Sequence, residues 1–183
     1  MYKRFQGHEQ WRTTYNRWNL IRNVAKVNAF NLELLRAPAP STLDNVRMWA
    51  TSFDKLMQSE IGRQIFTKFL ESEYSDENML FWNACEDLKK EKSSTKCVNM
   101  IKDIFEMFVA PCAPLEVNLD SKTRQELRKR MTENPDKKAF EPAQDAIYLL
   151  MKRDCFGRFV KSSIYQDFVK QVEMAAANSA NSL

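Results

Sequence analysis

The sequence predicts an all-α fold, and three observations support this. Glycine occurs three times and proline six times in 183 residues, so the chain is poor in the residues that turns require. Its long runs are built from Leu, Met, Glu, Lys, Gln, Arg and Ala, which are strong helix formers. Apolar residues recur in these runs at the helical period rather than alternating as in a strand. A chain of this length can bury a core in one domain without disulfides or metal.

Two prolines mark where the helical domain begins. Residues 37–40 read Ala-Pro-Ala-Pro, and proline cannot continue a helix and disfavours one in the residue before it. Ser41 follows as a candidate N-cap with Asp44 three positions on, which predicts a short helix through Trp49. Apolar residues at helical spacing then predict four more helices. Their expected ranges are 53–57, 60–73, 76–90 and 94–109.

Two breaks divide the second half of the chain. Residues 111–119 contain two prolines and predict a loop, after which Asp120 caps a charged helix over 122–133. The Asn-Pro pair at 134–135 ends that helix. A small and polar tail from Ala175 is expected to fray. Between these points the apolar pattern predicts helices over 141–153, 156–161 and 163–172.

The basic character of the chain belongs to its first 36 residues. They carry seven Lys or Arg and two Glu, a net charge of +5, whereas the remainder carries 21 basic and 22 acidic side chains. Aromatic and apolar residues at helical spacing line one face of this extension: Trp11, Tyr15, Trp18, Ile21 and Ala25. The pattern indicates a basic amphipathic helix, which would either lie on an anionic membrane surface or dock its aromatic face on the domain. Nucleic acid is not an expected partner, because no recognised binding motif is present.

The chain lacks the residues that most kinds of catalysis need. His8 is the single histidine and lies in the extension, so the domain has no histidine base or zinc ligand. Three glycines are too few for a phosphate-binding or dinucleotide-binding loop. The four cysteines form no CxxC pair, and no apolar run reaches the about 20 residues of a membrane span. We therefore expect a cytoplasmic protein that is not an enzyme and uses no metal or cofactor.

Four blocks of the sequence resemble the regulator of G-protein signalling (RGS) family in order and spacing. They are Ser52–Met57, Phe69–Trp82, Glu116–Ser121 and Leu150–Phe159. The residues of Ser52–Met57 and of Asn78–Trp82 resemble the RZ subgroup of this family. The resemblance implies a nine-helix fold in which a four-helix bundle packs beside a subdomain formed by the N- and C-terminal helices. The implied RGS domain spans 41–173, after an extension over 1–40 and before a frayed tail over 174–183.

The resemblance also implies a function. RGS domains bind the GTP-loaded α subunit (Gα) of a heterotrimeric G protein and accelerate its GTP hydrolysis, which terminates signalling. Gα already holds its nucleotide, magnesium, an arginine and a glutamine, so its partner needs to position groups rather than to add them. We expect a monomer that acts at the inner face of the plasma membrane on Gα of the i/o class, with the q class as the alternative. A scaffold that binds Gα or another signalling protein without accelerating hydrolysis is the rival interpretation.

Carried over position by position, the Gα-contacting surface comprises eight residues. They are Ser75, Glu77, Asn78, Asn118, Leu150, Asp154, Arg158 and Ser162. The resemblance expects Asn118 to reach the Gα switch region and steady its catalytic glutamine. Without the family, the same residue is an idle amide in a loop.

Other members of this surface also have simpler interpretations. Ser75 is a candidate N-cap, Glu77 is a first-turn acid favoured by the helix dipole, and Asn78 can make a local capping bond. Asp154 and Arg158 are spaced for an ion pair within one helix, worth a few tenths of a kcal/mol. With an exposed Leu150 one turn earlier, they would form a continuous stripe. The aromatic residues Phe81, Trp82, Phe156 and Phe159 are expected in the core.

Overall fold

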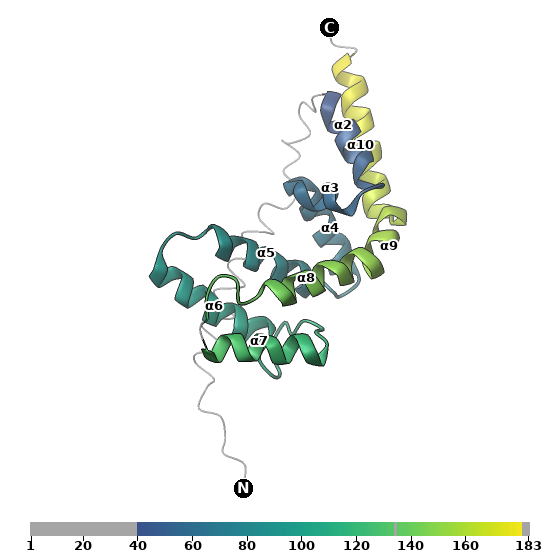
Figure 1. Ribbon diagram of the computed structural model, residues 1–183. Helices are drawn as coiled ribbons and strands as arrows, with labels where there is room; N and C mark the ends of the chain where they lie inside the picture. Colours follow the sequence, from purple (N-terminus) through teal and green to yellow (C-terminus); the bar gives the residue numbers. More distant parts are fainter. Residues whose placement is uncertain (1–39, 134, 181–183) are drawn as a thin grey trace. The chain divides into compact units, whose positions relative to one another are not determined.

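The computed structural model describes residues 40–133 and 135–180, and every regular element in them is helical (Figure 1). The all-α prediction is confirmed. The first helices are α2 (Pro40–Trp49), α3 (Phe53–Gln58), α4 (Glu60–Ser72), α5 (Glu77–Lys90) and α6 (Ser94–Phe108). They are followed by α7 (Ser121–Glu133), α8 (Glu141–Leu150), the π-helical segment η2 (Met151–Cys155), α9 (Phe156–Lys161) and α10 (Ser163–Ala180).

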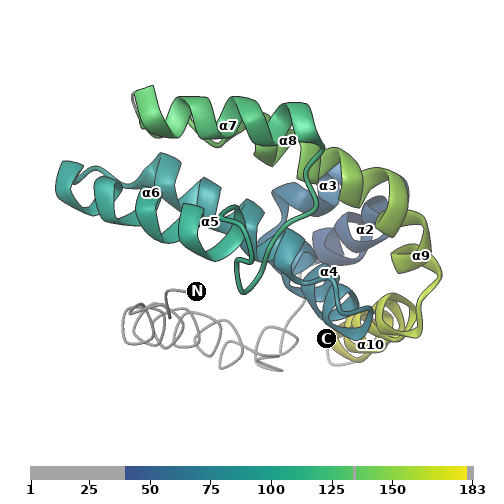
Figure 2. The same cartoon turned by 90° about the horizontal axis from the view of Figure 1, so that it is seen from below.

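The helices form two groups, as the resemblance implies. In the first, α5 packs on α6 and α8, and α7 packs on α8, which gives a four-helix bundle. In the second, α10 packs on α2, α4 and α9, and α3 packs on α2 and α4, so the first and last described helices lie side by side (Figures 1 and 2). The Tyr165 hydroxyl donates to the Val46 carbonyl oxygen at 2.8 Å and joins α10 to α2.

Each group has its own aromatic core. In the bundle, the Phe81 ring lies 5.6 Å from Phe108 and 6.3 Å from Phe140. In the second group, the Phe66 ring contacts Phe53 and Phe159 in edge-on geometry, at 5.6 and 5.1 Å. Phe81 and Phe159 are fully buried as predicted, whereas Trp82 and Phe156 are half-buried.

The helix predicted over 141–153 ends at Leu150 instead. Residues 151–155 form the π-helical segment η2, in which the Phe156 amide donates to the Met151 carbonyl oxygen. A π-turn takes one residue more per hydrogen bond than an α-turn, so it displaces every later side chain around the helix axis. Predicted spacings of four residues therefore fail across this segment.

The last helix is longer than its pattern predicted. It was expected to end at Val172, but α10 continues to Ala180. Its last turns contain the three consecutive alanines 175–177, and alanine is the strongest helix former. The helix therefore runs eight residues past its predicted end.

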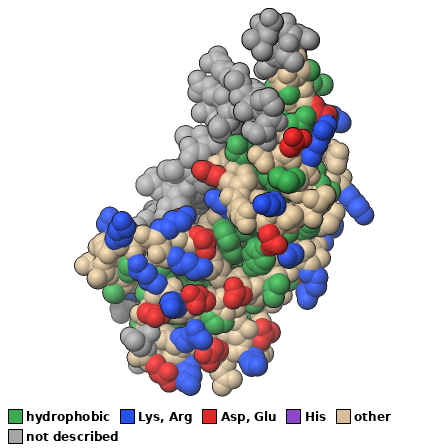
Figure 3. All heavy atoms as spheres, turned by 45° about the horizontal axis from the view of Figure 1, so that its top comes forward, with side chains coloured by type: hydrophobic (Ala, Val, Ile, Leu, Met, Phe, Trp, Pro, Cys, Tyr) green, Lys and Arg blue, Asp and Glu red, His purple; other side chains and the backbone are tan. Residues whose placement is uncertain are grey.

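Figure 3 shows one face of the molecule, on which acidic and basic side chains are intermixed with hydrophobic ones between them. This matches the near balance of charge that the sequence has after its first 36 residues. No helix in the described part of the chain is long and apolar enough to cross a membrane.

Adding a methyl group at the two described glycines, Gly62 and Gly157, is expected to change the free energy of unfolding in opposite directions. A Cβ on Gly62 would lie 2.5 Å from the Leu56 carbonyl oxygen, so the α3–α4 contact leaves no room for a methyl group. A Cβ on Gly157 would meet nothing within 4 Å. We expect Gly62→Ala to lower the free energy of unfolding by about 1–3 kcal/mol, and Gly157→Ala to raise it by about 0.5 kcal/mol. Urea unfolding of the two variants measures both, and equal effects would contradict the α3–α4 packing.

Candidate functional site

The topology brings three of the predicted segments to one end of the bundle. Helices α5 and α6 pack together and are joined by residues 91–93, so the start of α5 lies beside the end of α6. Gln144, near the start of α8, bonds to Trp82 and Glu86 in the second half of α5. Arg158, beyond the end of α8, bonds to Glu73, just before α5 begins. Together these contacts show that α8 runs antiparallel to α5. We call this the loop end, made by residues 73–78, 109–120 and 150–158.

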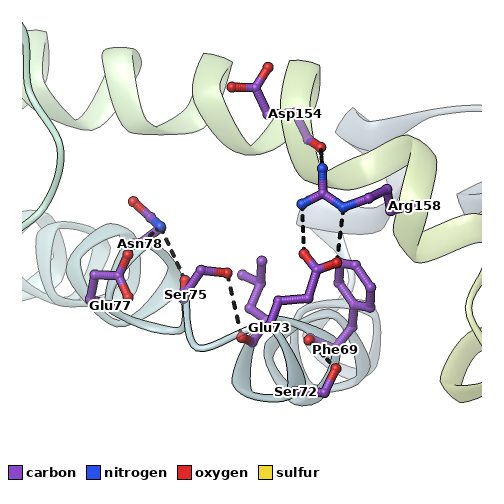
Figure 4. Close-up of polar contacts among 9 residues, drawn as sticks. Phe69, Ser72, Glu73, Ser75, Glu77, Asn78, Asp154 and Arg158 are labelled. Atoms are coloured by element: carbon purple, nitrogen blue, oxygen red, sulfur yellow. Dashed lines mark hydrogen bonds and ion pairs between the residues drawn. The ribbon is translucent and has the colours of Figure 1, made fainter.

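Ser75 lies in the α4–α5 turn and is not the N-cap of α5. That position is taken by Asp76, whose side chain makes no capping bond. The Ser75 amide and hydroxyl both donate to the Leu70 carbonyl oxygen, at 2.9 and 3.4 Å. Ser75 therefore helps to close the turn, and its carbonyl oxygen faces Asn78 (Figure 4).

Asn78 is buried at 5% exposure, which is unusual for a polar residue in the first turn of a helix. Its Nδ2 donates to the Ser75 carbonyl oxygen at 3.1 Å and to the Glu77 carboxylate at 2.7 Å. Its Oδ1 is buried without a hydrogen-bond partner in the described part of the chain. A buried acceptor without a donor costs free energy. The local capping interpretation therefore accounts for the Nδ2 group of Asn78 and does not account for its Oδ1 atom.

Glu77 accepts from Asn78 in a half-buried position. Burial raises the pKa of the Glu77 carboxyl, and the neighbouring charge of Asp76 acts in the same direction. A carboxyl whose pKa is raised by folding favours the folded state below its unfolded pKa, about 4.3. This contribution is lost as the pH rises through the raised value. At neutral pH the ionised Glu77 therefore lowers stability, which a purely structural residue has no reason to do.

We therefore expect Glu77→Gln to raise the midpoint of thermal unfolding by roughly 1–3 °C at pH 7. Glutamine keeps the oxygen that accepts from Asn78 and removes the buried charge. The difference from the parent should shrink as the pH falls through the raised pKa of Glu77 toward the unfolded pKa, about 4.3, because the folded carboxyl becomes neutral over this range. Calorimetry from pH 4 to pH 7 measures it, with Glu60→Gln at the exposed start of α4 as the matched control. A lower midpoint at pH 7 would show that the Glu77 charge stabilises the fold.

Asn118 is exposed in the α6–α7 loop, between two buried neighbours, Val117 and Leu119. The Val117 amide donates to the Phe108 carbonyl oxygen at 3.0 Å. Arg124 ties the loop further, donating to the Val109 carbonyl oxygen at 3.2 Å and pairing with Glu116 at 2.8 Å. The backbone is thus anchored on both sides of Asn118, and the side-chain amide of Asn118 is exposed to solvent.

The predicted ion pair between Asp154 and Arg158 is wrong. The Asp154 carboxylate pairs with its neighbour Arg153 at 2.7 Å, and this bond holds the pKa of Asp154 below its ordinary value. Arg158 turns the other way and pairs with Glu73, at 2.9 Å from Nε and 2.7 Å from Nη2 (Figure 4). Asp154 lies in η2, so its carboxylate does not face the side chain four positions on.

Leu150 and Ser162 also differ from expectation. Leu150 is half-buried, and the exposed leucine at the end of α8 is Leu149, at 61%. Ser162 ends α9, where its hydroxyl donates to the Phe159 carbonyl oxygen at 2.7 Å and accepts from the Tyr165 amide at 3.3 Å. The continuous stripe from Leu150 to Arg158 is therefore not formed, and Ser162 has a clear structural task.

Tyr74 in the α4–α5 turn is not among the site residues predicted from the sequence. This side chain is 94% exposed, the most exposed of the large hydrophobic residues described, and its backbone is left-handed with φ of 54°. Left-handed backbone is uncommon for a residue other than glycine and is often found at functional sites. The only signal in the sequence was a tyrosine placed between two polar residues just before a helix.

These features define a class of protein: an all-helical domain with exposed polar residues on an anchored loop at one end of its helix bundle. A family model described as the regulator of G protein signaling domain matches residues 52–168. The chain is 44% identical over 136 residues to regulator of G-protein signaling 20 of Gallus gallus, a match that covers 74% of this chain and 62% of that protein. It is 45% identical over 129 residues to regulator of G-protein signaling 5 of Sus scrofa, covering 70% and 71%.

The chain belongs to the regulator of G-protein signalling family. It is also 42% identical over 148 residues to regulator of G-protein signaling 19 of Homo sapiens, covering 81% of this chain and 66% of that protein. The matches to regulators of G-protein signaling 20 and 19 are consistent with the resemblance to the RZ subgroup. The chain spans only part of the length of regulator of G-protein signaling 20, 62% of the Gallus gallus protein and 34% of the Homo sapiens protein.

Proposed function

We propose that this chain is a GTPase-activating protein for Gα, which binds the GTP-loaded subunit and stabilises its switch segments in the transition-state conformation. The observation that carries the proposal is Asn118. It is an exposed amide on a loop tied to α6 and α7 by buried neighbours and by Arg124. A contact group on a fixed backbone loses little entropy on binding, so more of its interaction energy is available to the transition state.

The contact surface we propose is that of the resemblance, at the loop end. Asn118 and Asp154 are exposed there, and Ser75, Glu77 and Leu150 are partly exposed. Asn78 supports the proposal differently, since it is buried and its Nδ2 holds the Ser75 carbonyl oxygen and the Glu77 carboxylate in place. Arg158, which also pairs with Glu73, belongs to the surface as well. Ser162, whose hydroxyl bonds to the Phe159 carbonyl oxygen, completes it just beyond the loop end.

The mechanism that follows is positioning. The hydrolytic groups belong to Gα, and a partner that binds the reactive arrangement of the switch segments better than the ground state lowers the barrier. Each tenfold acceleration requires about 1.4 kcal/mol of this preference. One or two well-placed hydrogen bonds supply about that much. No group from this chain needs to touch the phosphate.

Single-turnover hydrolysis tests the proposal. Purified Gα of the i/o class is loaded with GTP, and phosphate release is followed at increasing concentrations of the full chain. The rate should rise with concentration and reach a plateau at least about 100-fold above that of Gα alone. A panel including the q class compares the two expected partners. An unchanged rate with every Gα would contradict the proposal, and binding without acceleration would favour a scaffold.

We further propose that the chain acts as a monomer in the cytoplasm, at the inner face of the plasma membrane. The basic extension over residues 1–36 is what suggests the membrane, and it lies outside the described residues. Sedimentation of residues 1–183 and 41–183 with anionic vesicles distinguishes the two interpretations of this extension. Equal binding by both would remove the membrane from the proposal.

A further inference from the structure

One ion pair links two of the segments at the loop end. The Glu73 carboxylate receives two parallel hydrogen bonds from the Arg158 guanidinium, at 2.9 and 2.7 Å, although the residues are 85 positions apart. The remaining nitrogen, Nη1, donates to the carbonyl oxygen of Asp154. A single planar group therefore joins the α4–α5 turn to the η2 segment (Figure 4).

The two groups that accept hydrogen bonds from Arg158 lie where the helical backbone is irregular. Glu73 is the C-cap of α4 and directly precedes the left-handed Tyr74. Asp154 lies in the π-helical segment, where the regular α-helical bonds are interrupted. Two bonds to the carboxylate and one to the carbonyl fix both position and angle, because the guanidinium is rigid and planar.

The arginine of this pair lies mostly in water. The Arg158 side chain is 57% exposed and that of Glu73 28%, so we expect the pair to contribute little to folding. The hydrogen bonds from Arg158 lower the pKa of Glu73, so the carboxylate stays ionised at neutral pH. The two-point geometry fixes the Glu73 carboxylate relative to the Asp154 carbonyl oxygen, between the predicted contact residues of the two segments.

We propose that Glu73 is a positioning residue, which acts through Arg158 to hold the Tyr74–Asn78 turn at a fixed distance from Asp154. Arg158 then serves the Gα surface as a strut, and its effect depends on Glu73. The inference rests on the proposed function, because it assigns a role within the same surface.

A double-mutant cycle tests the strut, with Glu73→Ala, Arg158→Ala and the double variant in single-turnover hydrolysis by Gα. Each single variant should raise the half-saturating concentration of the chain about tenfold, because misplaced contact groups bind less well. The double variant should lose no more than either single one, since each removes the same strut. The maximum rate should fall less than about threefold, because Asn118 lies on a separately anchored loop.

Glu173→Ala is the matched control. Glu173 also pairs with an arginine on the surface, Arg47, at 2.9 Å, but on α10 and α2 rather than at the loop end. It should leave the half-saturating concentration unchanged. Thermal midpoints of all four variants should lie within about 3 °C of the parent, and a larger fall in the Glu73 or Arg158 variants would mean that the pair serves folding.

The outcomes separate the strut from the proposed function. If the parent chain does not accelerate hydrolysis, the proposed function fails. If the parent is active and Glu73→Ala is unaffected, the strut is overturned. Losses that multiply in the double variant would also overturn it, because they would mean that Arg158 contacts Gα directly and independently of Glu73.

Discussion

Replacing Asn118 with Ala is expected to lower the maximum rate of GTP hydrolysis by Gα about 100-fold at saturating chain. A fixed amide that acts only on the transition state contributes about 2.7 kcal/mol for that factor. The substitution removes an exposed side chain whose neighbours, Val117 and Leu119, supply the packing of the loop. The free energy of unfolding should therefore change by no more than about 0.5 kcal/mol.

Asn99→Ala is the matched control for Asn118. Asn99 is an exposed asparagine near the start of α6, at the other end of the bundle from the α6–α7 loop. Single-turnover hydrolysis should show no change for this variant, and urea unfolding should show at most a gain of about 0.5 kcal/mol, because alanine is the better helix former. If Asn118→Ala retained the parent's maximum rate, the amide would be an idle loop residue and the proposed mechanism would lose its main support.

Replacing Asn78 with Ala should both weaken the acceleration and lower stability. The variant loses the hydrogen bond to the Ser75 carbonyl oxygen, which costs about 1 kcal/mol of unfolding free energy. The midpoint of unfolding should fall by about 2–4 °C. Because the turn that carries Ser75 and Glu77 loosens, the half-saturating concentration should rise about 10- to 100-fold.

Gln144→Ala shows which of the two effects of Asn78 belongs to the partner. Gln144 is a buried amide of the same bundle, 3% exposed, whose Nε2 donates to the Trp82 carbonyl oxygen at 3.1 Å. It should lower the unfolding midpoint by a similar amount and leave the acceleration intact. Equal losses of acceleration in both variants would mean that Asn78 acts through folding alone.

Much of the fold could be predicted because helical periodicity and caps are local properties of the sequence. Most helix starts agree within two residues, and the loop before Asp120 is where the prolines indicated. Asp120 indeed accepts from the Lys122 and Thr123 amides at 3.0 Å. The resemblance supplied what local patterns could not, namely which segments meet at the loop end.

The departures share a physical cause, since each depends on contacts between distant segments or on small differences in backbone energy. The η2 segment has sequence spacing that reads as α-helix, so the displaced side chain of Asp154 was not foreseeable. Arg158 had an apparent partner four positions away, yet Glu73, brought near by the fold, offers two-point geometry. The left-handed backbone of Tyr74 has no signature in residue spacing.

The most direct test of the account is to measure how tightly the chain binds Gα in three nucleotide states. These are GDP, a non-hydrolysable GTP analogue, and GDP with aluminium fluoride, which mimics the transferring phosphoryl group. We predict binding to the aluminium fluoride state at least about 10-fold tighter than to the GTP-analogue state, with GDP weakest. Equal affinity for the GTP-analogue and aluminium fluoride states would contradict the account, because uniform binding cannot accelerate hydrolysis.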